Sequence, residues 1–306
     1  MISFLKLIRY KNLLMVLLTM VLTKYALIES FLKETYLSNL DFTILALSVV
    51  LITAGGYIIN DIYDIETDKI NKPNKVFINV TISKKNAWRN YFLLTFLGLI
   101  LGVYLSFINE KLILSFIFIG TVLSLFFYSK YLKKNILIGN LLVSVLVGLS
   151  IFILILFEIH NHSENPKVNV ANVFKILFPF WLVIGYSFFA ILTTFIREII
   201  KDIEDIDGDL KLKAKTLPIV IGRKRASKVS FLFSCILLVF LLMVLQFIQN
   251  NYIFLGYGIG FLLLPLGSFL YKLWFAKSKK DFSKLSNLMK VIMLFGILSM
   301  LLFTIN

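Results

Sequence analysis

Nine apolar runs dominate this sequence, and each is about as long as a bilayer's hydrocarbon core is thick. They cover residues 12–32, 41–60, 91–108, 112–128, 136–157, 173–196, 229–249, 252–275 and 288–305. A helix needs about 20 apolar residues to cross that core, and a barrel strand needs about half as many. Because backbone polar groups cannot stay unpaired in lipid, we predict an all-α polytopic membrane protein. Its nine transmembrane helices would form one domain, residues 1–306.

Composition and charge support this topology. Of the 306 residues, 59% are hydrophobic and 16% are charged, against about 45–50% and about 25% in soluble proteins, which excludes a large soluble domain. On a soluble protein the net charge of +15 would suggest a nucleic-acid partner, but here 27 of the 32 Lys and Arg residues lie on alternate connections. By the positive-inside rule we expect those connections and the N-terminus in the cytoplasm and the C-terminus outside, with no nucleic-acid partner.

Two features within the spans have simple structural interpretations. Gly55 and Gly56 stand together in the second run, where they would let two helices approach closely. Lys24 lies inside the first run, where its ammonium group would either reach the interface or face a polar cavity.

Ten of the 17 acidic residues lie in two short stretches on the basic face of the predicted topology. Each stretch places three aspartates at positions i, i+3 and i+7, namely Asp61, Asp64 and Asp68 in the first and Asp202, Asp205 and Asp209 in the second. On a helix these positions share one face. We therefore predict two matching carboxylate faces at one end of the bundle.

Stacked carboxylates repel each other, so such a face needs a compensating cation. Mg²⁺ suits oxygen ligands, takes one or two carboxylates and completes its shell with water and phosphate oxygens. The two faces could therefore hold a diphosphate between them through Mg²⁺. Several basic residues are near enough in sequence or topology to contact the phosphates, namely Lys69, Lys72, Lys75, Lys130, Arg197 and Lys201. A lattice of salt bridges would explain one such stretch, but two with identical spacing favour a metal site.

These residues resemble a known family. The stretch Asn60-Asp61-Ile62-Tyr63-Asp64-Ile65-Glu66-Thr67-Asp68 is similar to the N-D-x-x-D-x-x-x-D motif of the UbiA superfamily of intramembrane prenyltransferases, and the second stretch resembles that family's later Asp-rich motif. The segment with Tyr128-Ser129, Leu132-Lys133 and Gly139-Asn140 and the nine-helix count also agree. One departure is Lys75-Val76, where the family commonly has Arg-Pro, and Lys75 lacks the planar fork that grips phosphate oxygens.

The resemblance implies that a prenyl group, geranylgeranyl here, passes from an allylic diphosphate to an acceptor with Mg²⁺ as the cofactor. The metal ligands and catalytic residues would be Asp61, Asp64, Asp68, Asp202, Asp205 and Asp209. The substrate-binding residues would be Asn60, Lys72, Lys75, Tyr128, Lys130, Arg197 and Lys201. The expected partners are a prenyl diphosphate, a membrane-resident acceptor and the lipid bilayer, with no obligate protein partner. The implied location is a prokaryotic plasma membrane.

The acceptor is the least constrained part of this interpretation, because it depends on pocket shape. Arg197 to Asp209, followed by Lys215-Thr216-Leu217-Pro218-Ile219, looks most like the branch that acts on geranylgeranylglyceryl phosphate. The alternative is an aromatic quinone precursor, 1,4-dihydroxy-2-naphthoate or 4-hydroxybenzoate.

Three other classes of protein fit less well. A cation-coupled transporter would place its acids near the bilayer midplane rather than at helix ends. A CDP-alcohol phosphotransferase would need an Ala-Arg pair after Asp207-Gly208, and the sequence has none there. A scaffold protein would leave the paired acid stretches unexplained.

Overall fold

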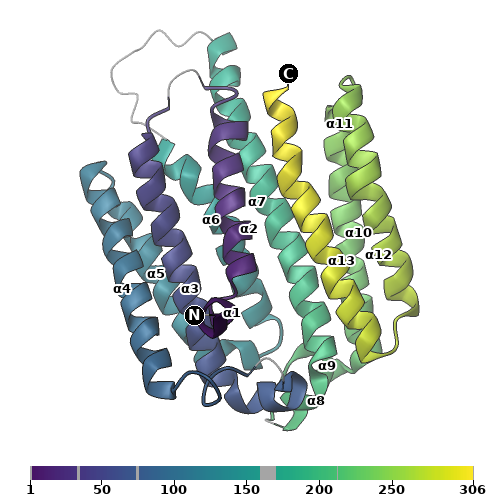
Figure 1. The fold of residues 1–306 in the computed structure, drawn as a ribbon. Coiled ribbons are helices and arrows are strands. Elements are labelled where there is room, and N and C mark those ends of the chain that lie inside the picture. Colours follow the sequence, from purple (N-terminus) through teal and green to yellow (C-terminus); the bar gives the residue numbers. More distant parts are fainter. Residues whose placement is uncertain (1, 33–34, 74–75, 159–169, 212, 306) are drawn as a thin grey trace.

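A computed structural model describes residues 2–32, 35–73, 76–158, 170–211 and 213–305, with the backbone alone for 170–176. Within these ranges the chain is a bundle of helices with a single isolated β-bridge between Ile78 and Ile82 (Figure 1). In chain order the helices are α1 (Ile2–Leu7), α2 (Tyr10–Val21), α3 (Asn39–Asn71), α4 (Lys84–Ile108), α5 (Ser115–Lys130), α6 (Ile138–Glu158), α7 (Val170–Glu204), α8 (Ile206–Lys211), α9 (Leu217–Ile221), α10 (Arg223–Phe247), α11 (Tyr252–Tyr257), α12 (Leu264–Phe275) and α13 (Lys279–Leu298).

In the described chain, nine helical segments are long and apolar enough to cross a membrane, which confirms the predicted number and order. They run over Tyr10–Ile28, Asn39–Asn71, Lys84–Ile108, Leu112–Lys130, Ile138–Glu158, Leu177–Glu204, Arg223–Phe247, Tyr252–Phe275 and Lys279–Thr304. The first combines α2 with a π-helical segment, Leu22–Ile28, and the eighth combines α11 with α12 through a second such segment, Gly258–Leu263. The N-terminus, α8 and α9 lie at one end of the bundle and the C-terminus at the other (Figure 1).

The helix α3 is longer than a membrane requires. Its 33 residues correspond to about 50 Å, whereas the hydrocarbon core is about 30 Å thick. The sequence predicts a span ending at residue 60, and the helix continues to Asn71. The added turns carry the first acid stretch beyond the apolar part of the bundle.

The two helices that bear the acid stretches, α3 and α7, each pack against a group of neighbouring helices. The helix α3 packs against α4 and α5, and α7 packs against α6, α10 and α13. Leu7 of the short helix α1 is fully buried with Ile58, Ile59 and Ile62 of α3. Burial of apolar side chains stabilises such contacts outside the lipid. The N-terminal segment is therefore fixed against the part of α3 that carries the acids.

Close backbone approach holds α3 against α4, as the glycines of the second run predict. A Cβ atom at Gly55 would lie 2.3 Å from Oγ1 of Thr95, and one at Gly98 would lie 3.0 Å from the carbonyl oxygen of Ser48. The Ser48 hydroxyl donates a hydrogen bond of 2.6 Å to the Gly98 carbonyl across this contact. Small residues at a helix crossing permit such distances. The crossing fixes where α3 lies.

Lys24, whose environment the sequence left open, is buried at the end of the bundle opposite α8. Its ammonium group donates a hydrogen bond of 2.6 Å to the Leu37 carbonyl. It also lies 3.1 Å from a carboxylate oxygen of Glu29 and 3.9 Å from one of Glu158. A buried charge is stable only when it is paired and hydrogen-bonded. Lys24 therefore joins the start of α3 to the end of α6.

The α3–α4 crossing yields a testable prediction. Replacing Gly98 by valine places a side chain against the Ser48 carbonyl, which cannot rotate away, so we expect the thermal midpoint of the protein in detergent to fall. Overpacking of this kind costs about 1–3 kcal/mol. Gly120 of α5 is the matched control, because a Cβ atom there meets nothing within 4 Å. Equal midpoints for Gly98→Val and Gly120→Val would contradict this account.

Candidate functional site: a cavity between two acid stretches

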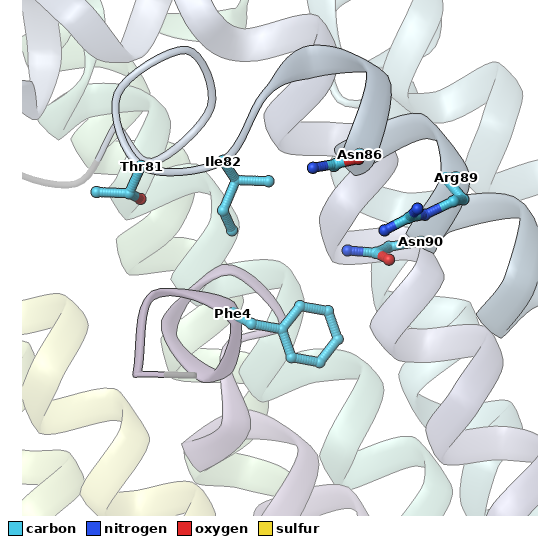
Figure 2. Close-up of a pocket in the computed structure, with 6 residues that line it drawn as sticks. All are labelled: Phe4, Thr81, Ile82, Asn86, Arg89 and Asn90. Atoms are coloured by element: carbon cyan, nitrogen blue, oxygen red, sulfur yellow. The ribbon is translucent and has the colours of Figure 1, made fainter.

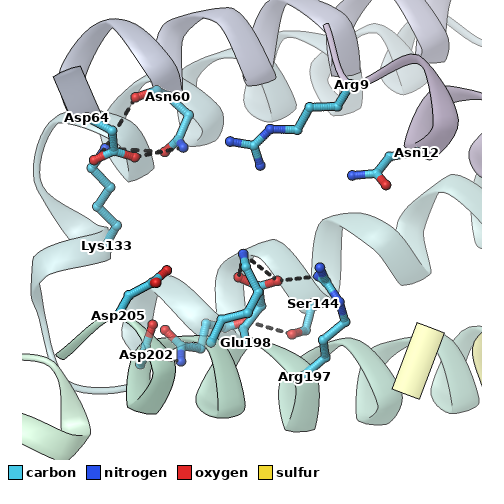
Figure 3. Close-up of polar contacts among 12 residues, drawn as sticks. Arg9, Asn12, Asn60, Asp64, Lys133, Ser144, Arg197, Glu198, Asp202 and Asp205 are labelled. Carbon is cyan, nitrogen blue, oxygen red and sulfur yellow. Dashed lines mark hydrogen bonds and ion pairs between the residues drawn. The ribbon is translucent and has the colours of Figure 1, made fainter. Parts of the chain in front are cut away.

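A cavity of about 650 Å³ opens at the N-terminal end of the bundle, between the ends of α3 and α7. All six predicted aspartates line it: Asp61, Asp64, Asp68, Asp202, Asp205 and Asp209. So do other predicted site residues, namely Asn60, Lys72, Tyr128, Arg197 and Lys201. Figure 3 shows α3 and α7 on opposite sides of the space, with their polar side chains directed toward it. The structure thus brings together acid stretches that are more than 130 residues apart.

The first acid stretch is continuous helix, as its spacing predicts. Asp64 accepts a hydrogen bond of 2.8 Å from the Asn60 side chain and a second one of 2.5 Å from the ammonium group of Lys133 (Figure 3). Lys133 also lies 3.3 Å from the Asn60 side-chain oxygen. Burial lowers the pKa of Lys133 in spite of the adjacent carboxylate. Asn60 and Lys133 together therefore orient Asp64.

Arg9 reaches this stretch from the junction of α1 and α2. Its guanidinium donates a hydrogen bond of 2.7 Å to Asp61 and lies 4.9 Å from the centre of the Tyr57 ring. Burial acts against its charge, but Asp61 and Tyr57 outweigh burial and raise the pKa of Arg9. The backbone of Arg9 is left-handed, with φ 52°, a conformation that costs energy in non-glycine residues and is concentrated at functional sites.

The second acid stretch differs from its prediction, because it is not one continuous helix. The helix α7 ends at Glu204, the chain bends at Asp205, and α8 begins at Ile206. Asp202 on the last turn of α7 accepts a hydrogen bond of 2.7 Å from Asn140 of α6. The bend brings α8 into contact with α3, so that Asp209 on α8 still lines the cavity.

Opposite charges stabilise the carboxylates around this bend. Lys72, just beyond α3, forms an ion pair with Asp205. Burial opposes the charge of Lys72, but Asp205 outweighs it and raises the pKa of Lys72. At Asp209, burial and the carboxylates of Asp205 and Asp64 raise the pKa to about 7. An added cation would therefore be stabilised here, because it would relieve the repulsion among these carboxylates.

Arg197 and Lys201 share one acidic partner on α7. Glu198 accepts a hydrogen bond of 2.8 Å from Arg197 (Figure 3) and one of 2.9 Å from Lys201. The Nε atom of Arg197 is buried and has no hydrogen-bond partner among the described residues. The two cations thus remain near the cavity, with one carboxylate between them.

Two predicted contacts, Lys69 and Lys130, do not line the cavity. Lys130 is exposed at the end of α5, and its ammonium group lies 4.9 Å from the centre of the Tyr131 ring. Lys75 lies outside the described residues. Lys133, three positions beyond Lys130, lines the cavity instead, because the turn at Tyr131–Lys134 directs it inward.

The lining residues that were not assigned to the site from the sequence include Arg9, Lys133, Asn140 and Glu198, each of which contacts a predicted site residue. Lys133 and Asn140 stand in the segment that resembles the family pattern, so that resemblance could have identified them as site residues. Arg9 appeared in the sequence only as one of the charges that set the topology.

The cavity fits a divalent cation that brings ligands of its own. Within the described ranges, no three His, Cys, Asp or Glu side chains converge closely enough to hold a metal ion alone. One carboxylate oxygen, Oδ1 of Asp205, is buried without a hydrogen-bond partner in the described chain. Mg²⁺ takes only one or two carboxylates and fills its shell with water and phosphate. The donor set therefore fits Mg²⁺ that arrives together with a diphosphate.

A second hollow, of about 450 Å³, lies beside α1 and has a different character. Its lining consists of Phe4, Thr81, Ile82, Asn86, Arg89 and Asn90 (Figure 2). It has one cation and no carboxylate, so it lacks the anionic oxygen ligands that a divalent cation such as Mg²⁺ prefers. The aspartates of both acid stretches line the larger cavity instead.

Comparison with known proteins agrees with this fold. The pattern of the UbiA prenyltransferase family matches residues 13–295. The digeranylgeranylglyceryl phosphate synthase of Methanosphaera stadtmanae is 31% identical over 279 residues, which cover 89% of this chain and 90% of that protein. This chain therefore belongs to the UbiA prenyltransferase family.

Solved structures share the same architecture. A structure of digeranylgeranylglyceryl phosphate synthase superimposes with a TM-score of 0.67 and 24% identity, covering 99% of this chain and 98% of the other. A UbiA homologue from Archaeoglobus fulgidus bound to GPP and Mg²⁺ gives a TM-score of 0.58 at 15% identity, covering 97% of this chain and 99% of the other. The UbiA fold predicted from the acid stretches and the helix count is confirmed.

The placement of the two lysines leads to a second prediction. We expect Lys133→Ala to reduce prenyl transfer about 10- to 100-fold, because a charge-assisted hydrogen bond to Asp64 is lost inside the cavity. The lysine outside the cavity, Lys130, serves as the comparison, and Lys130→Ala should change the rate far less. Initial rates on a common prenyl diphosphate measure both. A larger loss in Lys130→Ala would contradict the geometry.

Proposed function

We propose that this protein transfers a geranylgeranyl group from its diphosphate to geranylgeranylglyceryl phosphate, with Mg²⁺ as the cofactor. The observation that carries the proposal is the pair of acid stretches on opposite walls of one cavity (Figure 3). The acceptor is supported by the M. stadtmanae relative, which is similar along almost its entire length. The cofactor is supported by the structural neighbour that was solved with GPP and Mg²⁺.

The carboxylates proposed to hold the metal ions are those of the two acid stretches. Asp61, Asp64 and Asp68 would act from α3, and Asp202, Asp205 and Asp209 would act from α7 and α8. When bound, Mg²⁺ supplies positive charge that stabilises the negative charge developing on a departing diphosphate. Asn60 and Asn140 orient the carboxylates of Asp64 and Asp202 by the hydrogen bonds described above.

Cations of the protein complete the diphosphate site. Lys72 and Lys133 lie beside Asp205 and Asp64, so each can move to a phosphate oxygen when its carboxylate turns to a metal ion. Arg197 and Lys201 share Glu198, so their positive charge is only partly neutralised. These groups hold the diphosphate while the allylic carbon–oxygen bond breaks.

The reaction then joins the allylic carbon to the acceptor. Cleavage leaves diphosphate and an allylic cation, and the free hydroxyl oxygen of geranylgeranylglyceryl phosphate forms the new ether bond and releases a proton. The apolar bundle interior suits the isoprenoid chains. Because water would also capture the cation, the position of the site beside the apolar interior favours transfer over hydrolysis.

The test is a transfer assay with the purified protein in lipid. Labelled geranylgeranyl diphosphate is supplied with geranylgeranylglyceryl phosphate or with 1,4-dihydroxy-2-naphthoate, in Mg²⁺ or in EDTA. We expect product with the glyceryl phosphate in Mg²⁺ alone, and a loss of at least about 100-fold in Asp64→Ala.

Each other result has a definite meaning. Product with naphthoate alone would overturn the acceptor and move the protein to quinone synthesis. Full activity in Asp64→Ala or in EDTA would overturn the metal site. No transfer to either acceptor would overturn the proposed reaction.

We also propose that the cavity faces the cytoplasm, in a prokaryotic plasma membrane. Most Lys and Arg residues lie on the connections at the cavity end, and the positive-inside rule relates such connections to the cytoplasm.

Cysteine labelling tests this orientation. Single cysteines replace Lys211 on α8 or Tyr252 at the start of α11, which are exposed at opposite ends of the bundle, in a Cys235→Ser background. In intact cells we expect a membrane-impermeant maleimide to label Tyr252→Cys and to leave Lys211→Cys unlabelled. The reverse pattern would show that the cavity faces outward.

A further inference from the structure

Asn71, the last residue of α3, links the two acid stretches directly. Its side-chain nitrogen donates a hydrogen bond of 2.9 Å to the carbonyl oxygen of Asp205. Its side-chain oxygen accepts one of 2.9 Å from the backbone nitrogen of Gly208. The residue is 8% exposed. One amide therefore holds the bend between α7 and α8 against the helix that carries the first three aspartates.

The backbone of Gly208 packs closely against the side chain of Asn71. A Cβ atom at Gly208 would lie 2.4 Å from the side-chain nitrogen of Asn71, so a larger residue there would displace the amide. Lys72 follows Asn71 and pairs with Asp205. In the described chain, the side-chain hydrogen bonds that join the end of α3 to residues 205–208 come from these two neighbours.

The position of this link gives it a role in the site. Asp205 lies at the bend itself, and Asp209 follows Gly208 by one residue, so both carboxylates move with the backbone that Asn71 holds. Mg²⁺ requires nearly ideal octahedral geometry, and displacements of about 1 Å at a reacting centre cost about 100-fold in rate. The distance between the two carboxylate groups therefore has to be fixed.

We propose that Asn71 is a positioning residue that sets the spacing between the two carboxylate groups, so that both can engage one magnesium–diphosphate complex. It acts through Asp205 and Gly208, because its amide nitrogen and oxygen are hydrogen-bonded to their backbone. The inference rests on the proposed function for the identity of that complex, but the geometry that it concerns is testable without prenyl transfer.

The first experiment measures binding of inorganic diphosphate to the full-length protein as Mg²⁺ is titrated. The loss of two hydrogen bonds should raise the half-saturating Mg²⁺ concentration about tenfold in Asn71→Ala. Gly208→Ala should give a similar rise, because its Cβ atom displaces the Asn71 amide. In the double variant the new methyl group enters the space that Asn71 left, so its effect should be no larger than that of either single change.

The matched control is Asn109, which follows α4 directly at the opposite end of the bundle. In the described chain its side chain hydrogen-bonds within its own helix turn, to the Leu105 carbonyl. Asn109→Ala should bind Mg²⁺ and diphosphate as the wild type does. Thermal midpoints without Mg²⁺ show how far each variant is destabilised. Wild-type Mg²⁺ dependence in both Asn71→Ala and Gly208→Ala, whatever their midpoints, would overturn the proposal.

A second experiment measures the spacing itself and needs no ligand. Spin labels on cysteines at Lys69 and Lys211, both exposed, report the distance between α3 and α8 in a Cys235→Ser background. We expect one narrow distribution in the otherwise unchanged protein and in Asn109→Ala, and a broad or shifted one in Asn71→Ala. An unchanged distribution in Asn71→Ala would overturn the proposal even if transfer to the glyceryl phosphate is confirmed. If instead the wild type transfers nothing but Asn71→Ala alters both spacing and Mg²⁺ binding, the proposed function fails and the positioning role stands.

Discussion

The burial of carboxylates at the end of an apolar bundle is the constraint on which the rest of this structure depends. Seven acidic side chains line the cavity, the six aspartates and Glu198. Ionised groups away from water cost several kcal/mol each unless they are paired. Three cations from different parts of the chain form ion pairs with these acids. They are Arg9 at the junction of α1 and α2, Lys72 after α3 and Lys133 in the turn after α5. The segments that carry these three cations therefore lie against the site, where their positive charges offset those of the acids.

The features that the sequence predicted are those that local pattern determines. The spans follow from the length of the apolar runs, because runs this long are helices rather than barrel strands where the backbone must be paired in lipid. The first acid stretch follows from helical periodicity, which places Asp61, Asp64 and Asp68 on one face. In each case the residues that specify the feature are neighbours in the chain.

The features that the sequence did not predict depend on the direction in which a side chain points and on partners that are far away in the sequence. Lys130 and Lys133 have the same chemistry and nearly the same position in the sequence, but the end of α5 falls between them and sends one outward and the other inward. The carbonyl of Asp205, at the bend, accepts a hydrogen bond from Asn71, which is 134 residues away. Lys24 is stable within a span because the Leu37 carbonyl and the carboxylates of Glu29 and Glu158 surround its ammonium group. No periodicity in the sequence encodes such pairings.

The attachment of residues 2–9 also bears on how the protein can be handled. Leu7 is buried against α3 and Arg9 is paired with Asp61, so the amino end of the chain forms part of the cavity wall. A purification tag or fusion partner joined there would sit beside the acids and add its own charges to theirs. The carboxyl end lies at the far end of the bundle (Figure 1), and a tag placed there leaves the charge balance of the site as the native chain sets it.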